Sequence, residues 1–225
     1  PVPRQFPHNS LPYAGTLVWD KPLDKAGLRL SLIPYATLKV IKNSEEDGSV
    51  GWKWNAGFDT KMILSTSMNL DLTFNPDYSQ VEEDRQQTNL DRFELFYPER
   101  RQFFLENSDL FSNLGNSQAQ PFFSRRIGLN VPVNFGGRLT GRIGNKWRIG
   151  LMDIQTGSKS DLLASNYAVA VLQREIFSRS SIVGFLVNKQ ITQSHSDTDF
   201  AGYDYNRVAG LEYNFATADN KLQGK

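Results

Sequence analysis

The residues between 77 and 109 carry the densest set of side chains that could do chemistry. Nine carboxylates fall in this stretch. Oxygen ligands at such density could bind calcium. The candidate ligands are Asp77, Glu82 and Asp84, although the spacing of an EF-hand loop is missing. Calcium is therefore one hypothesis for this stretch, and the sequence indicates no other cofactor.

The same carboxylates have many basic neighbours, which supports a second hypothesis. Arg–carboxylate pairs satisfy both partners through parallel hydrogen bonds, so they suit a confined, hydrated interior. We accordingly expect a structural charge network as the main role of these residues. Its members would be Asp77, Glu82, Asp84, Arg92, Glu94, Glu99, Arg100, Arg101, Glu106, Arg125 and Arg126.

Glu82 and Asp84 also raise the possibility of acid–base catalysis. On a strand they would share one face about 6.5–7 Å apart, a separation found in inverting glycosidases. Two carboxylates at this spacing are common, however, and the chain has no G-x-S-x-G nucleophile elbow. Its only histidines are His8 and His195, and neither is accompanied by a nucleophile elbow. The sequence identifies no catalytic residue and favours a protein that is not an enzyme.

Aromatic rings alternate with these charges in RFELFYPERRQFFLE, residues 92–106. The rings could form a sugar-stacking surface, or they could pack an inserted segment against the rest of the fold. Pro98 cannot donate a hydrogen bond to a strand ladder, so we expect no central strand to run through this position. The candidate stacking residues are Phe93, Phe96, Tyr97, Phe103 and Phe104.

The bulk composition excludes several classes of protein. The 25 basic and 24 acidic residues nearly balance, and no nucleic-acid-binding motif appears, so we expect no nucleic-acid partner. The absence of cysteine excludes disulfide scaffolds and Cys-based metal sites. No apolar run is long enough for a transmembrane helix, and the first residues lack the regions of a signal peptide. We expect a processed chain or a segment of a longer one.

The elements that position these residues have a periodicity of two, which indicates β-strands. In residues 133–144, Val133 and Phe135 begin a mostly apolar face, whereas Arg138 and Thr140 belong to the other. The same alternation recurs along the chain, and we expect about nine or ten strands. The clearest further examples are residues 51–59, 69–75, 147–152 and 209–215.

Such strands fit two architectures. In a soluble sandwich the apolar face would point at a second sheet. In an outer-membrane barrel it would point at lipid, with the polar face towards the lumen. Strands of roughly 9–11 residues, rings near strand ends and polar faces of Arg, Gly, Asn and Thr favour the antiparallel transmembrane barrel.

Three motifs add a family resemblance. They are NPDYSQVEED (residues 75–84), RFELFYPERRQFFLE (92–106) and FSRRIG (123–128). Together they resemble the DUF5916 family of Bacteroidota and related Gram-negative bacteria. Three positions of the second motif depart from the family pattern: Tyr97, Arg100 and Gln102. The resemblance implies an outer-membrane protein in which a carbohydrate-binding family 9-like domain precedes a β-barrel, and this chain resembles the start of the barrel portion.

These observations lead to one expected architecture and function. Residues 1–225 would form a single, incomplete segment of the barrel, and residues 75–128 an inserted plug, gate or docking element. The protein would act without catalysis in glycan or nutrient handling or transport at the envelope of a Gram-negative bacterium. Its partners would be outer-membrane lipid, a polysaccharide or oligosaccharide, and other envelope proteins. The alternative is a soluble β-sandwich that binds or processes carbohydrate.

Overall fold

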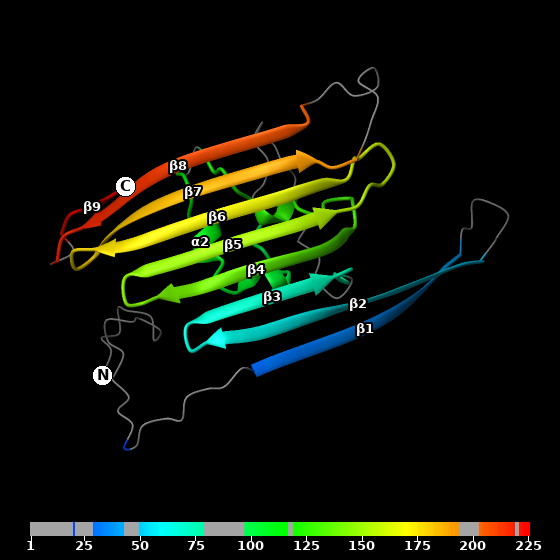
Figure 1. The fold of residues 1–225 in the computed structure, drawn as a ribbon. Coiled ribbons are helices and arrows are strands. Elements are labelled where there is room, and N and C mark those ends of the chain that lie inside the picture. Colours follow the sequence, from blue (N-terminus) through cyan, green and yellow to red (C-terminus); the bar gives the residue numbers. More distant parts are fainter. Residues whose placement is uncertain are drawn as a thin grey trace, which may run out of the picture.

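The computed structural model describes residues 20, 29–42, 50–78, 97–116, 119–193, 203–218 and 221–225. They form one antiparallel sheet in which each strand pairs with the next along the chain (Figure 1). The prediction of an all-β, antiparallel fold is confirmed. The nine strands are β1 (Arg29–Lys42), β2 (Val50–Ser65), β3 (Met68–Phe74), β4 (Val133–Ile143), β5 (Trp147–Thr156), β6 (Ser165–Ile176), β7 (Ser180–Ile191), β8 (Tyr205–Ala216) and β9 (Gln223–Gly224).

The sheet is open rather than closed. Within the described residues, β1 pairs with β2 alone, and no pairing joins β1 to β8 or β9. The sequence predicts an incomplete segment of a barrel, and the described strands form an open sheet that does not close on itself. In the described part of the chain, helix is confined to short pieces between β3 and β4. They are α1 (Gln102–Leu105), α2 (Asp109–Ser112) and the 3-10 helix η2 (Ser124–Arg126).

Connections at the two ends of the strands differ greatly in length. At one end, short turns at residues 66–67, 144–146 and 177–179 join the strands, and β8 ends there too. At the other end the connections span residues 43–49, 75–132, 157–164 and 192–204. We call these the turn end and the loop end of the sheet.

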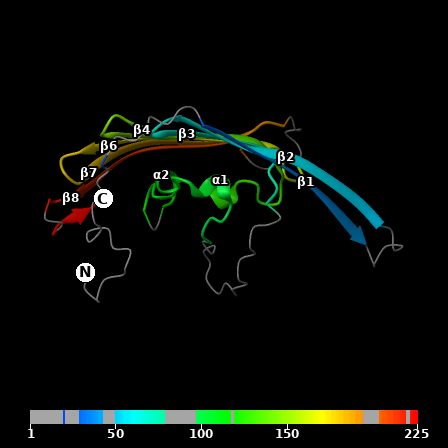
Figure 2. The ribbon, with the colours of Figure 1, turned by 90° about the horizontal axis from the view of Figure 1, so that it is seen from below.

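The sheet curves, and the short helices lie on its concave side (Figure 2). Because directly paired residues share a face, the strand register assigns each side chain to one side. The buried pair Asp71 and Arg138 faces the concave side, whereas the paired Leu70 and Leu139 face the convex side. The predicted separation of polar and apolar faces therefore holds across β3 and β4.

The first residues of β4 depart from strict alternation. The register shifts between Val133 and Phe135, which indicates a β-bulge. Val133 is buried in the core, whereas Phe135 is about half exposed and pairs with Phe74 of β3. The sequence pattern placed Val133 and Phe135 on one face. This assignment is wrong, because the bulge inserts an extra residue between them.

Candidate functional site

The concave face is filled by the long connection between β3 and β4. Its described residues from 97 to 132 lie beneath the curved sheet, and α2 contacts β5 and β6 (Figure 2). The connection leaves and rejoins the sheet at the loop end, since β3 ends and β4 begins there. We call residues 97–132 the inner segment.

Apolar side chains of the inner segment form one core with the concave face. Gly150 of β5 makes room for this contact, since a Cβ at this position would lie 2.9 Å from Cζ of Phe111. The rings of Phe103 and Phe104 meet edge-on, with centroids 5.2 Å apart. The core comprises Phe103, Phe104, Leu110, Phe111, Leu114, Phe122 and Ile127 of the inner segment, and Val133, Met152, Ile154, Val169, Val171 and Val183 of the strands.

Arg101 is a buried guanidinium that closes the inner segment on itself. It donates to Glu99 from Nε (2.9 Å) and Nη2 (2.8 Å), a bidentate pair. It also donates to the carbonyl oxygens of Ile127 (2.6 Å) and Ser124 (2.7 Å). The guanidinium lies 4.2 Å from the ring centroid of Phe104. Arg101 thus links Glu99, near the start of the inner segment, to Ser124 and Ile127, near its end.

Arg138 of β4 fixes the inner segment to the sheet. Its side chain is 1% exposed and forms an ion pair with Asp71 of β3, Nη2 to Oδ2 2.8 Å. Nη1 donates to the backbone carbonyl of Glu106 at 2.6 Å. The guanidinium also lies 5.4 Å from the ring centroid of Phe103. One strand arginine therefore satisfies a strand carboxylate and holds the backbone of the inner segment.

Glu106 gathers further contacts from the strands. Its carboxylate accepts hydrogen bonds from Lys61 of β2 and from Asn69 Nδ2 of β3, the latter at 2.9 Å. Burial alone would raise the pKa of Glu106, yet the hydrogen bond and charge of Lys61, with Arg138, lower it below its ordinary value. Glu106 is thus held ionised against the concave face.

Glu99 and Tyr78 respond differently to burial beside Arg101. Burial opposes ionisation of Glu99, but hydrogen bonds and charge from Arg101, with the Ser124 hydroxyl, lower its pKa below the ordinary value. For Tyr78, burial dominates and raises the pKa of the hydroxyl despite the opposing charge of Arg101. The carboxylate is therefore ionised, while the phenol stays protonated.

A comparison with protein-family models gives one match, to the domain of unknown function DUF5916, over residues 26–141. The chain belongs to the DUF5916 family. No curated protein and no solved structure matches it. The family match includes β1 to β3, the whole connection 75–132 and most of β4. It therefore contains both buried arginines, Arg101 and Arg138.

The structure brings together some residues of the charge network expected for this DUF5916 chain. Glu99 and Arg101 pair directly, and Glu106 binds Lys61. Asp77, Arg100, Arg125 and Arg126 lie in the described connection, whereas Glu82, Asp84, Arg92 and Glu94 lie outside the described residues. Sequence reasoning missed Lys61, Asp71 and Arg138, because their contacts depend on strand register.

The structure describes three of the five candidate sugar-stacking residues. Phe103 and Phe104 are buried in the core, and Tyr97 is partly buried. Phe93 and Phe96 lie outside the described residues. The two buried rings pack against neighbouring side chains of the DUF5916 inner segment.

The calcium hypothesis rests mostly on residues outside the described ranges. Asp77 is described, but Glu82 and Asp84 are not. Elsewhere in the described ranges, no cluster of three or more His, Cys, Asp or Glu residues could hold a metal ion. Among these residues there is also no helix long and apolar enough to cross a membrane.

Proposed function

We propose that this DUF5916 chain forms part of the wall of an antiparallel β-barrel in the outer membrane of a Gram-negative bacterium. The observation that carries the proposal is the apolar convex face. Its large side chains are exposed, and nothing among the described residues covers them (Figure 2). The most exposed examples include Trp54 at 78% and Leu211 at 79%. Such a face is costly in water and is what a barrel presents to lipid.

The apolar belt runs diagonally across the strands. On β1 and β2 it reaches far towards the loop end, to Val40 and its partner Trp52. On β7 and β8 the positions nearest the loop end are instead polar, as in the paired Asn188 and Arg207. Tilted strands require this displacement if the belt is to lie level in a bilayer.

Aromatic side chains border the belt at both ends. Trp52 and Trp54 lie towards the loop end of β2, and Trp147 and Tyr213 lie at the turn end of β5 and β8. Arg174 lies 5.0 Å from the ring centroid of Trp147. Rings beside a cation at the edge of an apolar band are typical of a membrane interface.

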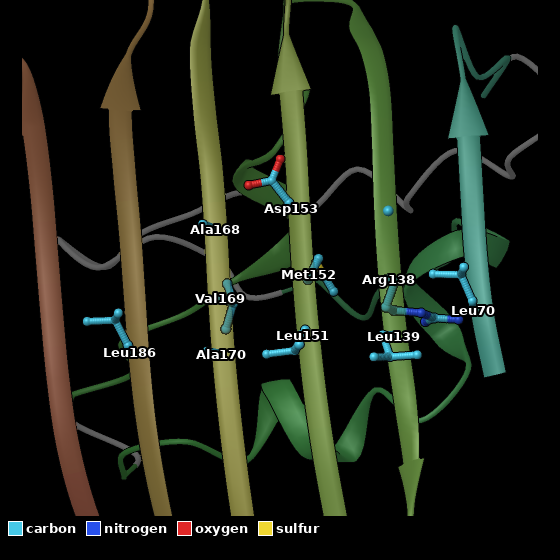
Figure 3. A pocket seen from close by; sticks show the side chains of 11 residues that line it. Leu70, Arg138, Leu139, Leu151, Met152, Asp153, Ala168, Val169, Ala170 and Leu186 are labelled. Carbon is cyan, nitrogen blue, oxygen red and sulfur yellow. The ribbon is translucent and has the colours of Figure 1, made fainter. Parts of the chain in front are cut away.

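Between these borders the convex face has a shallow apolar hollow of about 350 Å³. Leucine side chains from four strands surround it, namely Leu70, Leu139, Leu151 and Leu186 (Figure 3). Small residues line it too, among them Ala168 and Ala170. In the proposed setting, lipid acyl chains fill this hollow.

Loop length supports an orientation for the proposed barrel. Bacterial outer-membrane barrels have short periplasmic turns and longer extracellular loops. The turn end would accordingly face the periplasm, and the connection 75–132 would enter from the outside and act as a plug. The process would be glycan or nutrient handling or transport, with oligosaccharide or polysaccharide and other envelope proteins as partners.

Membrane fractionation and gel migration test this proposal. We expect the protein to be recovered from the outer membrane only with detergent, and to migrate differently on gels before and after boiling. A fully soluble, monomeric product without heat-dependent migration would contradict the proposed membrane location.

A further inference from the structure

A polar cavity of about 400 Å³ opens between the concave face and the inner segment, near the turn end. This size lies within the range of about 300–1,000 Å³ found for small-molecule sites. Its lining includes Ser67 from the turn between β2 and β3, and Asn107 from the short connection between α1 and α2. The cavity is separate from the buried Arg101 cluster and from the apolar hollow of the convex face.

Two arginines from neighbouring strands line the cavity. Arg142 of β4 and Arg148 of β5 are direct cross-strand partners, so their side chains leave the same face close together. Like charges directly opposite each other are destabilising on a sheet. Arg142 bonds Glu175 at 3.2 Å, and Arg148 bonds Asp109 at 2.8 Å. An anion between the two guanidinium groups would relieve their repulsion further.

The arginine geometry suits a carboxylate in particular. Each of the two bridges uses Nη1 of its arginine, and a guanidinium carries donors on three nitrogens. Paired N–H groups of arginine match the two oxygens of a carboxylate. Arg142 is half exposed, whereas Arg148 is mostly buried, so the pair spans the mouth and the interior of the cavity.

Neutral polar side chains form most of the remaining lining, and hydrogen bonds hold two of them in position. Asn69 Nδ2 donates to Glu106 at 2.9 Å, and Asn107 Nδ2 donates to Oγ1 of Thr140 at 3.0 Å. Both amides thus have an anchored NH₂ group, and each also has a carbonyl oxygen that can accept from a ligand hydroxyl. Leu110 supplies an apolar surface on the same cavity.

We propose that this cavity is a binding site for a sugar acid, a polyhydroxylated carboxylate of monosaccharide size. Arg142 and Arg148 bind its carboxylate, and Asn69 and Asn107 accept hydrogen bonds from its hydroxyls. The cavity is larger than a bare inorganic anion requires, and its neutral lining matches hydroxyl groups. The site does not depend on insertion of the convex face into lipid.

Isothermal titration calorimetry of the purified protein tests the site, with D-glucuronate as the probe and D-glucose as the matched ligand without a carboxylate. We expect one site for glucuronate and at least roughly tenfold weaker binding of glucose, since a charge-assisted hydrogen bond contributes that much or more. Arg142→Gln and Arg148→Gln should each weaken glucuronate binding roughly tenfold or more. Arg179→Gln, at an exposed turn residue that does not line the cavity, should leave binding unchanged.

Three results would overturn the inference. Absence of a binding signal for glucuronate in the wild-type protein removes the site. Equal effects of Arg142→Gln and Arg179→Gln place any binding elsewhere, provided that both variants retain the wild-type melting temperature. If Arg148→Gln fails to fold, Arg142→Gln decides alone, because Arg142 is half exposed. Phosphate binding as tight as that of glucuronate would show that the hydroxyls contribute nothing and would exclude a sugar acid.

Discussion

At the scale of single residues, two buried arginines organise the concave face. Arg101 and Arg138 each combine an ion pair, at least one backbone carbonyl acceptor and an aromatic neighbour. A buried charge is costly unless such partners satisfy it. Removing one partner of a buried ion pair should therefore destabilise the fold far more than removing one partner of an exposed pair. The two pairs therefore hold the inner segment in one position.

Arg138→Gln should destabilise the fold strongly, because it leaves Asp71 buried without its partner. Breaking a buried pair in this way costs about 3–5 kcal/mol. The matched variant Arg142→Gln, in a half-exposed pair with Glu175, should cost at most about 1 kcal/mol. Chemical denaturation of the three proteins measures both values. Equal losses would show that Arg138 does not hold the inner segment.

Acid should destabilise the fold through Glu99 and Glu106. Their folded pKa values lie below the ordinary value of 4.5, so their ionised forms stabilise the fold above that pH. This stabilisation is lost as the pH falls below 4.5 and through the folded pKa values.

Melting curves between about pH 6 and pH 3 measure this loss, and Glu99→Gln should flatten the acid dependence. The control is Glu175→Gln, which removes a half-exposed carboxylate and should leave the slope nearly unchanged. An identical slope in wild type and Glu99→Gln would contradict this role for Glu99.

At the scale of elements, the sequence predicts the strands better than it predicts the contacts of the inner segment. The period of two predicted the strands and the polar character of the face that carries Arg138. Glu99 and Arg101 both belong to the predicted charge network, although the sequence does not indicate which residues of that network pair. Asp71 and Arg138 are 67 residues apart, and only the β3–β4 register brings them together. The bulge after Val133 leaves no clear signal in the sequence, so the alternation predicts the wrong face for Val133.

Gly150→Val should displace the inner segment from β5. The added side chain would overlap the Phe111 ring, and overpacking of this kind costs about 1–3 kcal/mol. Limited proteolysis within residues 97–132 should be faster than in the wild-type protein. Gly184→Val is the matched control, since the nearest atom to a Cβ there is Cδ1 of Leu211 at 4.0 Å. If both variants are cleaved at the wild-type rate, the contact of Phe111 with Gly150 does not hold the segment.

At the scale of the whole molecule, the sheet separates two environments. Its concave face is joined to the inner segment by apolar packing and ion pairs, and its convex face presents an apolar belt bordered by rings. The nine described strands leave both edges of the sheet open. The membrane proposal assigns lipid to the belt and further pairing to the edges, because unpaired backbone groups are not tolerated in a bilayer.

A charge in the middle of the belt should be costly in a bilayer. Leu151→Arg places a cation there and should lower the free energy of unfolding in lipid vesicles by about 2–4 kcal/mol. Asn188→Arg, at the polar end of the same face, should cost only about 0–1 kcal/mol. Reversible denaturation in vesicles measures the difference. Similar small losses for both variants would mean that Leu151 does not face hydrocarbon.

Spin labels along β7 test the central claim most directly, since the chain has no cysteine of its own to interfere. Single cysteines at positions 182 to 187, labelled and placed in lipid vesicles, would report access to oxygen and to a water-soluble nickel complex. We predict that positions 182, 184 and 186, on the convex face, favour oxygen, while 183, 185 and 187 are shielded from lipid. Higher access to the nickel complex than to oxygen at 182, 184 and 186 would contradict a lipid-facing sheet.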